Sequence, residues 1–121
     1  MKRIRRSAAI VGFASATLLA LSNPAQAAQG TWKVDIPRCK IYQEVKLMGN
    51  PKHDHMRWYT TGGSNGCEAW INDTAHGTTK GRKEITNNGS YYSDWYYDGP
   101  GYKMAVCGRN SSGQMECGPY N

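Results

Sequence analysis

The sequence predicts an all-β fold, a small disulfide-stapled antiparallel β-sandwich preceded by a cleaved signal peptide. Three observations favour this fold class. Of the 14 glycines and 5 prolines, 13 glycines and 4 prolines follow residue 27 and interrupt helical periodicity there. Short segments in which apolar and polar residues alternate recur between turn-rich stretches, as is typical of sandwiches. Four cysteines follow a leader that has the features of an export signal.

The first 27 residues predict a secretory signal peptide. The chain opens with four cationic residues, continues with an apolar run over residues 8–21, and reaches a small-x-small cleavage pattern at Ala25-Gln26-Ala27. The apolar run is shorter than the ~20 residues that a membrane span needs. We therefore expect residues 1–27 to be removed, and residues 28–121 to form a single secreted, extracellular domain of bacterial type without a membrane anchor.

The net charge of +6 belongs mostly to this leader. Removing Lys2, Arg3, Arg5 and Arg6 from the 15 basic residues leaves 11, against 9 acidic residues, a net charge of +2. Such a balance does not favour nucleic acid as a partner.

Because exported proteins fold in an oxidising environment, the four cysteines predict two disulfides. Three pairings are possible. Cys107 and Cys117 flank a turn-rich stretch over residues 110–113, so they could face each other across a hairpin. We therefore expect the sequential pairing, Cys39 with Cys67 and Cys107 with Cys117. A structural zinc site is typically formed by close C-x-x-C pairs, and the sequence has none.

The first half of the domain predicts three strands. Residues 31–36 alternate, with Trp32, Val34 and Ile36 on one face, and Pro37 ends them. Residues 39–48 predict a second strand, residues 50–54 a loop, and residues 56–61 a short third strand.

The second half predicts four or five more strands. Residues 67–72 alternate again, with Cys67, Ala69 and Ile71 inward and Trp70 outward. The glycine-rich, basic residues 77–83 predict a mobile loop, and residues 83–86 a weak strand before a hairpin turn at residues 87–89. The remaining strands are expected over residues 90–98, 102–107 and 114–117.

The densest aromatic segment lies in the strand expected over residues 90–98. Alternation would place Tyr92, Asp94, Tyr96 and Asp98 on one face, opposite Tyr91, Ser93, Trp95 and Tyr97. Carboxylates among tyrosines indicate a solvent-directed face that could bind a sugar chain or another protein. Alternatively, Tyr92 and Tyr96 merely cover the sheet as cross-strand partners. A slip of one residue exchanges the two faces, so the sequence leaves open which of them is exposed.

A second candidate site is the triplet Arg57-Trp58-Tyr59. Arg, Trp and Tyr are the side chains most enriched at protein–protein hot spots. A disulfide at Cys67 would pre-organise the triplet, and Trp70 could extend the patch. The alternative is that Trp58 lies in the core between exposed Arg57 and Tyr59.

Three short motifs within residues 39–67 carry a resemblance to a known family. They are Cys39-Lys40-Ile41-Tyr42-Gln43, Arg57-Trp58-Tyr59-Thr60-Thr61 and Asn65-Gly66-Cys67. Together they resemble the first disulfide loop of tendamistat-type α-amylase inhibitors. The resemblance implies a small secreted bacterial β-sandwich with two sequential disulfides, in which an exposed Trp-Arg-Tyr triplet enters the enzyme's cleft. Here the triplet is ordered Arg-Trp-Tyr.

Two weaker patterns concern metal binding and catalysis. His53 and His55 could ligate Zn²⁺ or Cu²⁺ with Asp54 or His76, but a solvated loop is the simpler interpretation, and we expect no metal. His76, Arg82 and Glu84 lie close in sequence and could serve a small secreted ribonuclease.

These observations favour a monomeric, non-enzymatic binding protein without a cofactor. We expect a proteinaceous inhibitor or interaction module of an extracellular enzyme. A cell-wall or polysaccharide-binding module is the alternative, and a ribonuclease is the third hypothesis.

Overall fold

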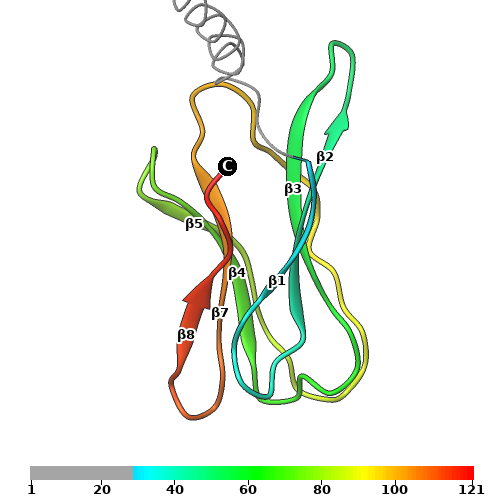
Figure 1. Ribbon diagram of the computed structural model, residues 1–121, viewed down its shortest axis with the longest axis vertical. Coiled ribbons are helices and arrows are strands. Elements are labelled where there is room, and N and C mark those ends of the chain that lie inside the picture. The colour runs from blue at the N-terminus through cyan, green and yellow to red at the C-terminus, as the bar shows by residue number, and fades with distance from the viewer. Residues whose placement is uncertain (1–28) are drawn as a thin grey trace, which may run out of the picture.

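The computed structural model describes residues 29–121, which form eight strands and no helix. The strands are β1 (Gly30–Val34), β2 (Ile41–Met48), β3 (His53–Thr60), β4 (Glu68–Asp73), β5 (Thr78–Glu84), β6 (Tyr96–Tyr97), β7 (Met104–Arg109) and β8 (Met115–Cys117). They form two four-stranded antiparallel sheets, a first sheet in the order β1-β2-β3-β6 and a second in the order β5-β4-β7-β8 (Figure 1). The predicted all-β sandwich is confirmed, and the predicted leader lies outside the described residues.

The first sheet has one face in the core and one toward solvent because its residues alternate. Along β3, half-buried and buried side chains alternate from His53 to Thr60. β2 pairs with β3 without a break, from Ile41 opposite Thr60 to Met48 opposite His53. Directly opposed residues of antiparallel strands point to the same face. The outward side chains of the two strands therefore form one continuous surface.

The core between the sheets is centred on Trp58, which is 1% exposed. The Trp58 indole Nε1 donates a hydrogen bond to the carbonyl oxygen of Gly81 on β5, at 2.7 Å. Gly81 has φ +62°, and a Cβ there would come within 3.1 Å of the Tyr96 ring. Position 81 of β5 therefore requires a glycine, where the strand passes close to the Tyr96 ring.

Gln43 joins the two sheets through the core. Its side chain is fully buried, its Oε1 accepts a hydrogen bond from the Val106 amide at 2.8 Å, and its Nε2 donates to the Pro119 carbonyl at 2.8 Å. Since a buried amide without partners would be costly, these bonds fix how the sheets stack.

The sequential disulfide pairing is confirmed. Cys39 is bonded to Cys67, and Cys107 to Cys117, so no cysteine in the described part of the chain is free. Cys107 and Cys117 are direct partners on β7 and β8, as the hairpin argument predicts. Two disulfides in a domain of this size indicate an oxidising environment.

Three strand predictions are wrong in extent. β3 begins at His53, inside the expected loop, because its residues complete the pairing with β2. The expected mobile loop over residues 77–83 is strand β5, which pairs along β4. The strand expected over residues 90–98 shrinks to β6 and one isolated bridge between Tyr59 and Tyr92.

Candidate binding face

The solvent-directed side of the first sheet carries most of the exposed aromatic surface. Tyr42 lies opposite Tyr59, and Glu44 opposite Arg57, so all four side chains point outward. The segment after β5 adds further rings above them. We call this surface the aromatic face, formed by Tyr42, Glu44, Arg57, Tyr59, Tyr92, Trp95 and Tyr97.

Arg57 lies at the centre of the aromatic face. Its Nε donates to Glu44 Oε1 at 2.9 Å. Its guanidinium carbon is 4.6 Å from the centre of the Trp95 ring and 4.7 Å from that of Tyr92. Both distances are within the range of cation–π attraction. The guanidinium is thus held by one carboxylate and two rings in a single orientation.

The tyrosines around Arg57 differ in exposure. Tyr42 and Tyr59 stack with ring centres 5.0 Å apart, whereas the Tyr92 side chain is 64% exposed. Burial raises the pKa of the Tyr59 phenol above its ordinary value, and the neighbouring Glu44 carboxylate and Tyr42 phenol raise it further. The phenol therefore stays neutral at physiological pH and keeps its O–H as a donor.

A groove of about 330 Å³ runs beside Arg57. It is lined by Glu44, Arg57, Tyr59, Thr60, Thr61, Ser90 and Tyr92. One wall is the β3 strand and the other is the irregular segment that carries Tyr92. The groove therefore combines a guanidinium, a carboxylate, hydroxyl groups and two rings in one open depression.

Backbone hydrogen bonds fix the irregular segment to β3. The Thr60 amide donates to the Tyr91 carbonyl at 2.8 Å, and the Ser93 amide donates to the Trp58 carbonyl at 2.9 Å. The Ser93 hydroxyl accepts a bond from the Trp58 amide at 3.0 Å. Tyr92 is thus exposed on an anchored backbone, which lowers the entropic cost of ordering it on association.

The structure separates the predicted site residues. Arg57 and Tyr59 lie together on the aromatic face, while Trp58 is in the core, as the alternative interpretation expected. Trp70 points to the outer side of the second sheet but is only 7% exposed, because the Arg82 guanidinium covers it at 4.3 Å. Neither tryptophan can contact a partner in this conformation.

The predicted face of Tyr92, Asp94, Tyr96 and Asp98 does not exist as a unit. Tyr92 and Asp94 are exposed, Tyr96 packs against the core, and Asp98 is 4% exposed. Strict alternation requires a continuous strand, and this segment is a strand only at Tyr96–Tyr97. The irregular backbone instead brings Tyr92 and Trp95 to the same side.

Four members of the aromatic face are not among the residues predicted from the sequence: Tyr42, Glu44, Trp95 and Tyr97. Glu44 meets Arg57 only through the register of β2 on β3. This register could have been predicted by pairing the two alternating segments around a turn near Pro51. Nothing comparable placed Trp95 over Arg57, because that contact depends on an irregular segment.

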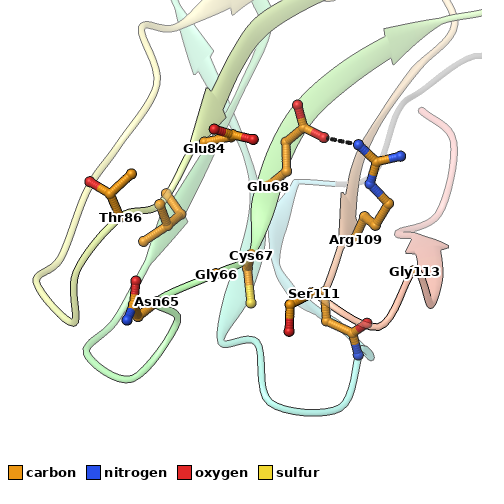
Figure 2. A pocket seen from close by; sticks show the side chains of 11 residues that line it. Asn65, Gly66, Cys67, Glu68, Glu84, Thr86, Arg109, Ser111 and Gly113 are labelled. Carbon is orange, nitrogen blue, oxygen red and sulfur yellow. Dashed lines mark hydrogen bonds and ion pairs between the residues drawn. The ribbon is translucent and has the colours of Figure 1, made fainter.

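A hollow of about 560 Å³ lies at one end of the second sheet, where β4 begins and β5 and β7 end (Figure 2). Glu68 and Glu84 are direct partners across β4 and β5, and Arg109 and Arg82 both bind Glu68, at 2.6 and 3.0 Å. Burial by itself raises the pKa of Glu68, but hydrogen bonds from the two arginines hold it below its ordinary value. The lining contains no aromatic ring for stacking.

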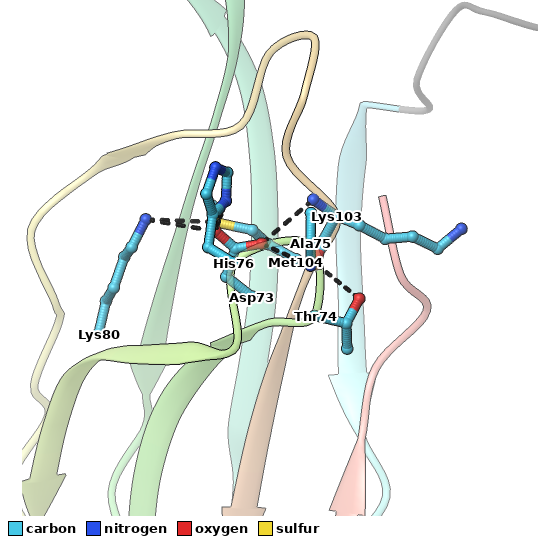
Figure 3. Close-up of polar contacts among 7 residues, drawn as sticks. All are labelled: Asp73, Thr74, Ala75, His76, Lys80, Lys103 and Met104. Carbon is cyan, nitrogen blue, oxygen red and sulfur yellow. Dashed lines mark hydrogen bonds and ion pairs between the residues drawn. The ribbon is translucent and has the colours of Figure 1, made fainter.

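A polar cluster surrounds Asp73 at the turn between β4 and β5 (Figure 3). Asp73 is fully buried, and its Oδ2 is 2.7 Å from His76 Nδ1 and 3.7 Å from Lys80 Nζ. Burial by itself raises the pKa of Asp73, but the bonds from His76 and the Lys103 amide and the nearby positive charges hold it below its ordinary value.

The residues of the ribonuclease hypothesis do not form one site. His76 contacts Asp73 and Tyr102, Arg82 binds Glu68, and Glu84 lines the hollow on the second sheet. His76 thus lies in the Asp73 cluster, whereas Arg82 and Glu84 both adjoin Glu68 on the second sheet.

His53 and His55 share the outward side of β3, where both rings pack edge-on against Tyr97. Asp54 points inward and is 8% exposed. Within residues 29–121, no three His, Cys, Asp or Glu side chains are grouped so that they could hold a metal ion.

Comparisons with known proteins add no relative. No family model, no curated protein and no solved structure matches this chain. In the described part of the chain, there is no helix of the length and apolarity that a membrane crossing requires.

Proposed function

We propose that this protein is a secreted, non-enzymatic binding protein that docks another extracellular protein through the aromatic face. The observation that carries the proposal is the Arg57 guanidinium, clamped by Glu44 and two rings beside a largely exposed Tyr92. Arginine and tyrosine dominate binding energy at protein interfaces because they combine large buried area with directional hydrogen bonds.

The scaffold under the face supports this role. Two disulfides and the Gln43 bridge between the sheets limit motion of the strands, and the irregular segment is bonded to β3. Rigid surfaces lose less conformational entropy on association than mobile ones do. The aromatic face therefore has the pre-organisation that tight binding requires.

The charges around the face favour a partner with an acidic surface. Lys33 and Lys46 lie opposite Tyr42 and His55, so they flank the aromatic face on its outward side. With Arg57, which is itself paired with Glu44, they outnumber the carboxylates of Glu44 and the exposed Asp94. Complementary charge of this kind speeds association and selects among partners.

Inhibition of an enzyme is the form of this function to test first. We would assay secreted amylases and proteases with and without a stoichiometric amount of the protein. Inhibition should fall about tenfold or more in Tyr92→Ala and Arg57→Ala, because each removes a central contact. Tyr120→Ala is the matched control, since Tyr120 is a 39%-exposed tyrosine bonded to Asn72 of the second sheet. Equal inhibition by all four proteins would overturn the proposal.

A polysaccharide partner is the second candidate, favoured by the open ring of Tyr92. Flat exposed rings stack on sugars, and the hydroxyls of the groove could bond to them. Pull-down on chitin, cellulose and peptidoglycan tests this candidate. Retention that Tyr92→Ala abolishes, with no enzyme of the panel inhibited, would favour the sugar over the protein.

A further inference from the structure

Asp98 is the most anomalous buried group in the described part of the chain. It directly follows β6, and its side chain is 4% exposed. Its Oδ2 accepts a hydrogen bond from Asn121 Nδ2 at 2.9 Å, whereas its Oδ1 has no hydrogen-bond partner. Unsatisfied buried polar atoms are rare and call for an explanation.

The groups around Asp98 disfavour its negative charge. Asp54 on β3 and Asp73 on β4 are both buried and add negative charge, while Lys80 on β5 supplies the opposing positive charge. The Lys80 ammonium is also shared with Asp73, which His76 binds from the adjoining turn. An ionised Asp98 is therefore a buried carboxylate near two other carboxylates. Its charge is opposed only by the amide of Asn121 and by the ammonium of Lys80, which Asp73 shares.

Asp98 is also tied to the aromatic face. β6 is held to β3 by the pairs of Tyr97 with His55 and of Tyr96 with Met56, and by the bond from the Asp98 amide to the Asp54 carbonyl at 2.9 Å. A two-residue strand has few bonds of its own. The bond of Asp98 to Asp54 is therefore one of the anchors of β6, beside the packing of the Tyr97 ring on His53 and His55.

We propose that Asp98 is a proton-operated latch, which holds β6 and Tyr97 in place when its carboxyl is protonated and loosens them when it ionises. Partner binding at the aromatic face then weakens from mildly acidic to mildly alkaline pH. This regulation rests on the proposed function, but the latch itself belongs to the free protein.

The direction of the effect follows from proton linkage. Burial raises the pKa of Asp98 to about 7 against the hydrogen bond from Asn121, and the charges of Asp54 and Asp73 raise it further. A carboxyl whose pKa is higher in the closed state binds its proton more tightly there. The stabilisation is therefore complete only below the ordinary carboxyl pKa of 3.8, and it is lost progressively as the pH rises from there through about 7.

Amide hydrogen exchange of the free protein tests the latch. Two amides report on this segment, that of Asp98, bonded to the Asp54 carbonyl, and that of Tyr102, bonded to the Gly99 carbonyl. From about pH 6 to about pH 8, we expect their protection, corrected for intrinsic exchange, to fall about tenfold. Asp98→Asn, which mimics the neutral acid, should keep its protection at both pH values. Glu116→Gln removes an exposed carboxylate on β8 and should behave like the wild type.

Asn121→Ala is a second variant that spares the carboxyl group. Because the Asn121 bond favours the ionised form of Asp98, its loss should move the midpoint of the transition to higher pH. A wild-type pH dependence that persists in Asp98→Asn, or a midpoint that does not move in Asn121→Ala, would overturn the latch.

The outcomes separate the latch from the proposed function. If protection responds as expected but neither enzyme nor polysaccharide binds, the latch stands and the docking function fails. If a partner binds equally well at about pH 6 and about pH 8 while Asp98→Asn matches the wild type, the docking function stands and the latch fails.

Discussion

The outer sides of the two sheets use the same chemistry with different results. On the first sheet, Arg57 lies against Trp95 and Tyr92, and the Tyr92 ring stays 64% exposed. On the second sheet, Arg82 lies over Trp70, and the indole is only 7% exposed.

The difference lies in what else surrounds each arginine. Arg82 and Arg109 both bind Glu68, and Trp70 lies directly opposite Cys107 of the second disulfide, so this surface is closed by its own contacts. Among the described residues, Arg57 has Glu44 as its one carboxylate partner, and Tyr92, whose ring lies against it, stays 64% exposed. An arginine beside aromatic rings therefore does not identify a binding surface by itself. The exposure of the ring decides which of the two arginine–aromatic clusters can contact a partner.

The largest expected effect breaks the closed surface. Trp70→Ala should cost about 3–5 kcal/mol of unfolding free energy, because it removes a buried ring from beneath Arg82. Tyr92→Ala should change stability by less than about 0.5 kcal/mol. Urea denaturation of both variants measures the contrast, and equal losses would contradict the assignment of the two faces.

The second disulfide should contribute the next largest effect. Replacing both Cys107 and Cys117 by Ala should cost about 3 kcal/mol, mostly by freeing the unfolded chain. Thermal unfolding of this double variant measures the loss. If a partner of the aromatic face is found, its binding, measured well below the unfolding transition, should be unaffected. A specific loss of that binding would show that the two faces are coupled.

Glu68 offers a smaller, pH-dependent test of the closed surface. Since the pKa of Glu68 is lower in the folded state, its contribution is present at neutral pH and disappears as acid protonates it. Glu68→Gln should cost about 1 kcal/mol at neutral pH and reduce the acid sensitivity of unfolding. Glu84→Gln is the matched control, because Glu84 is exposed and faces Glu68 across the strands.

The smallest effect on stability concerns the open surface. Arg57→Lys keeps the charge but loses the planar guanidinium that lies against two rings, and it should cost only about 0.5 kcal/mol. Binding, measured by titration calorimetry against any enzyme that is inhibited, should weaken about tenfold. Unchanged affinity would mean that the partner does not engage this group.

The regular parts of the fold were predictable and the irregular part was not. Alternation along β3 placed Arg57 and Tyr59 on one side and left Trp58 for the core, as the alternative interpretation expected. The same rule failed for residues 90–98, because this segment is not paired continuously with a neighbouring strand and its side chains do not alternate between two faces. Glycine-rich β5 has no alternation of buried and exposed residues that would predict a strand, although it pairs with β4, its neighbour in sequence.

The sequence by itself determined the all-β class, the sequential disulfides and the alternation of β2 and β3, since these depend on local periodicity and on turns between near neighbours. Only the tertiary structure decided which aromatic rings are exposed. Arg82 covers Trp70, Trp95 meets Arg57, and Asp98 is buried near Asp54 and Asp73 through contacts between distant segments. Burial depends on how the two sheets and the irregular segment pack together, and so the tertiary structure decides whether a ring is buried or can bind a partner.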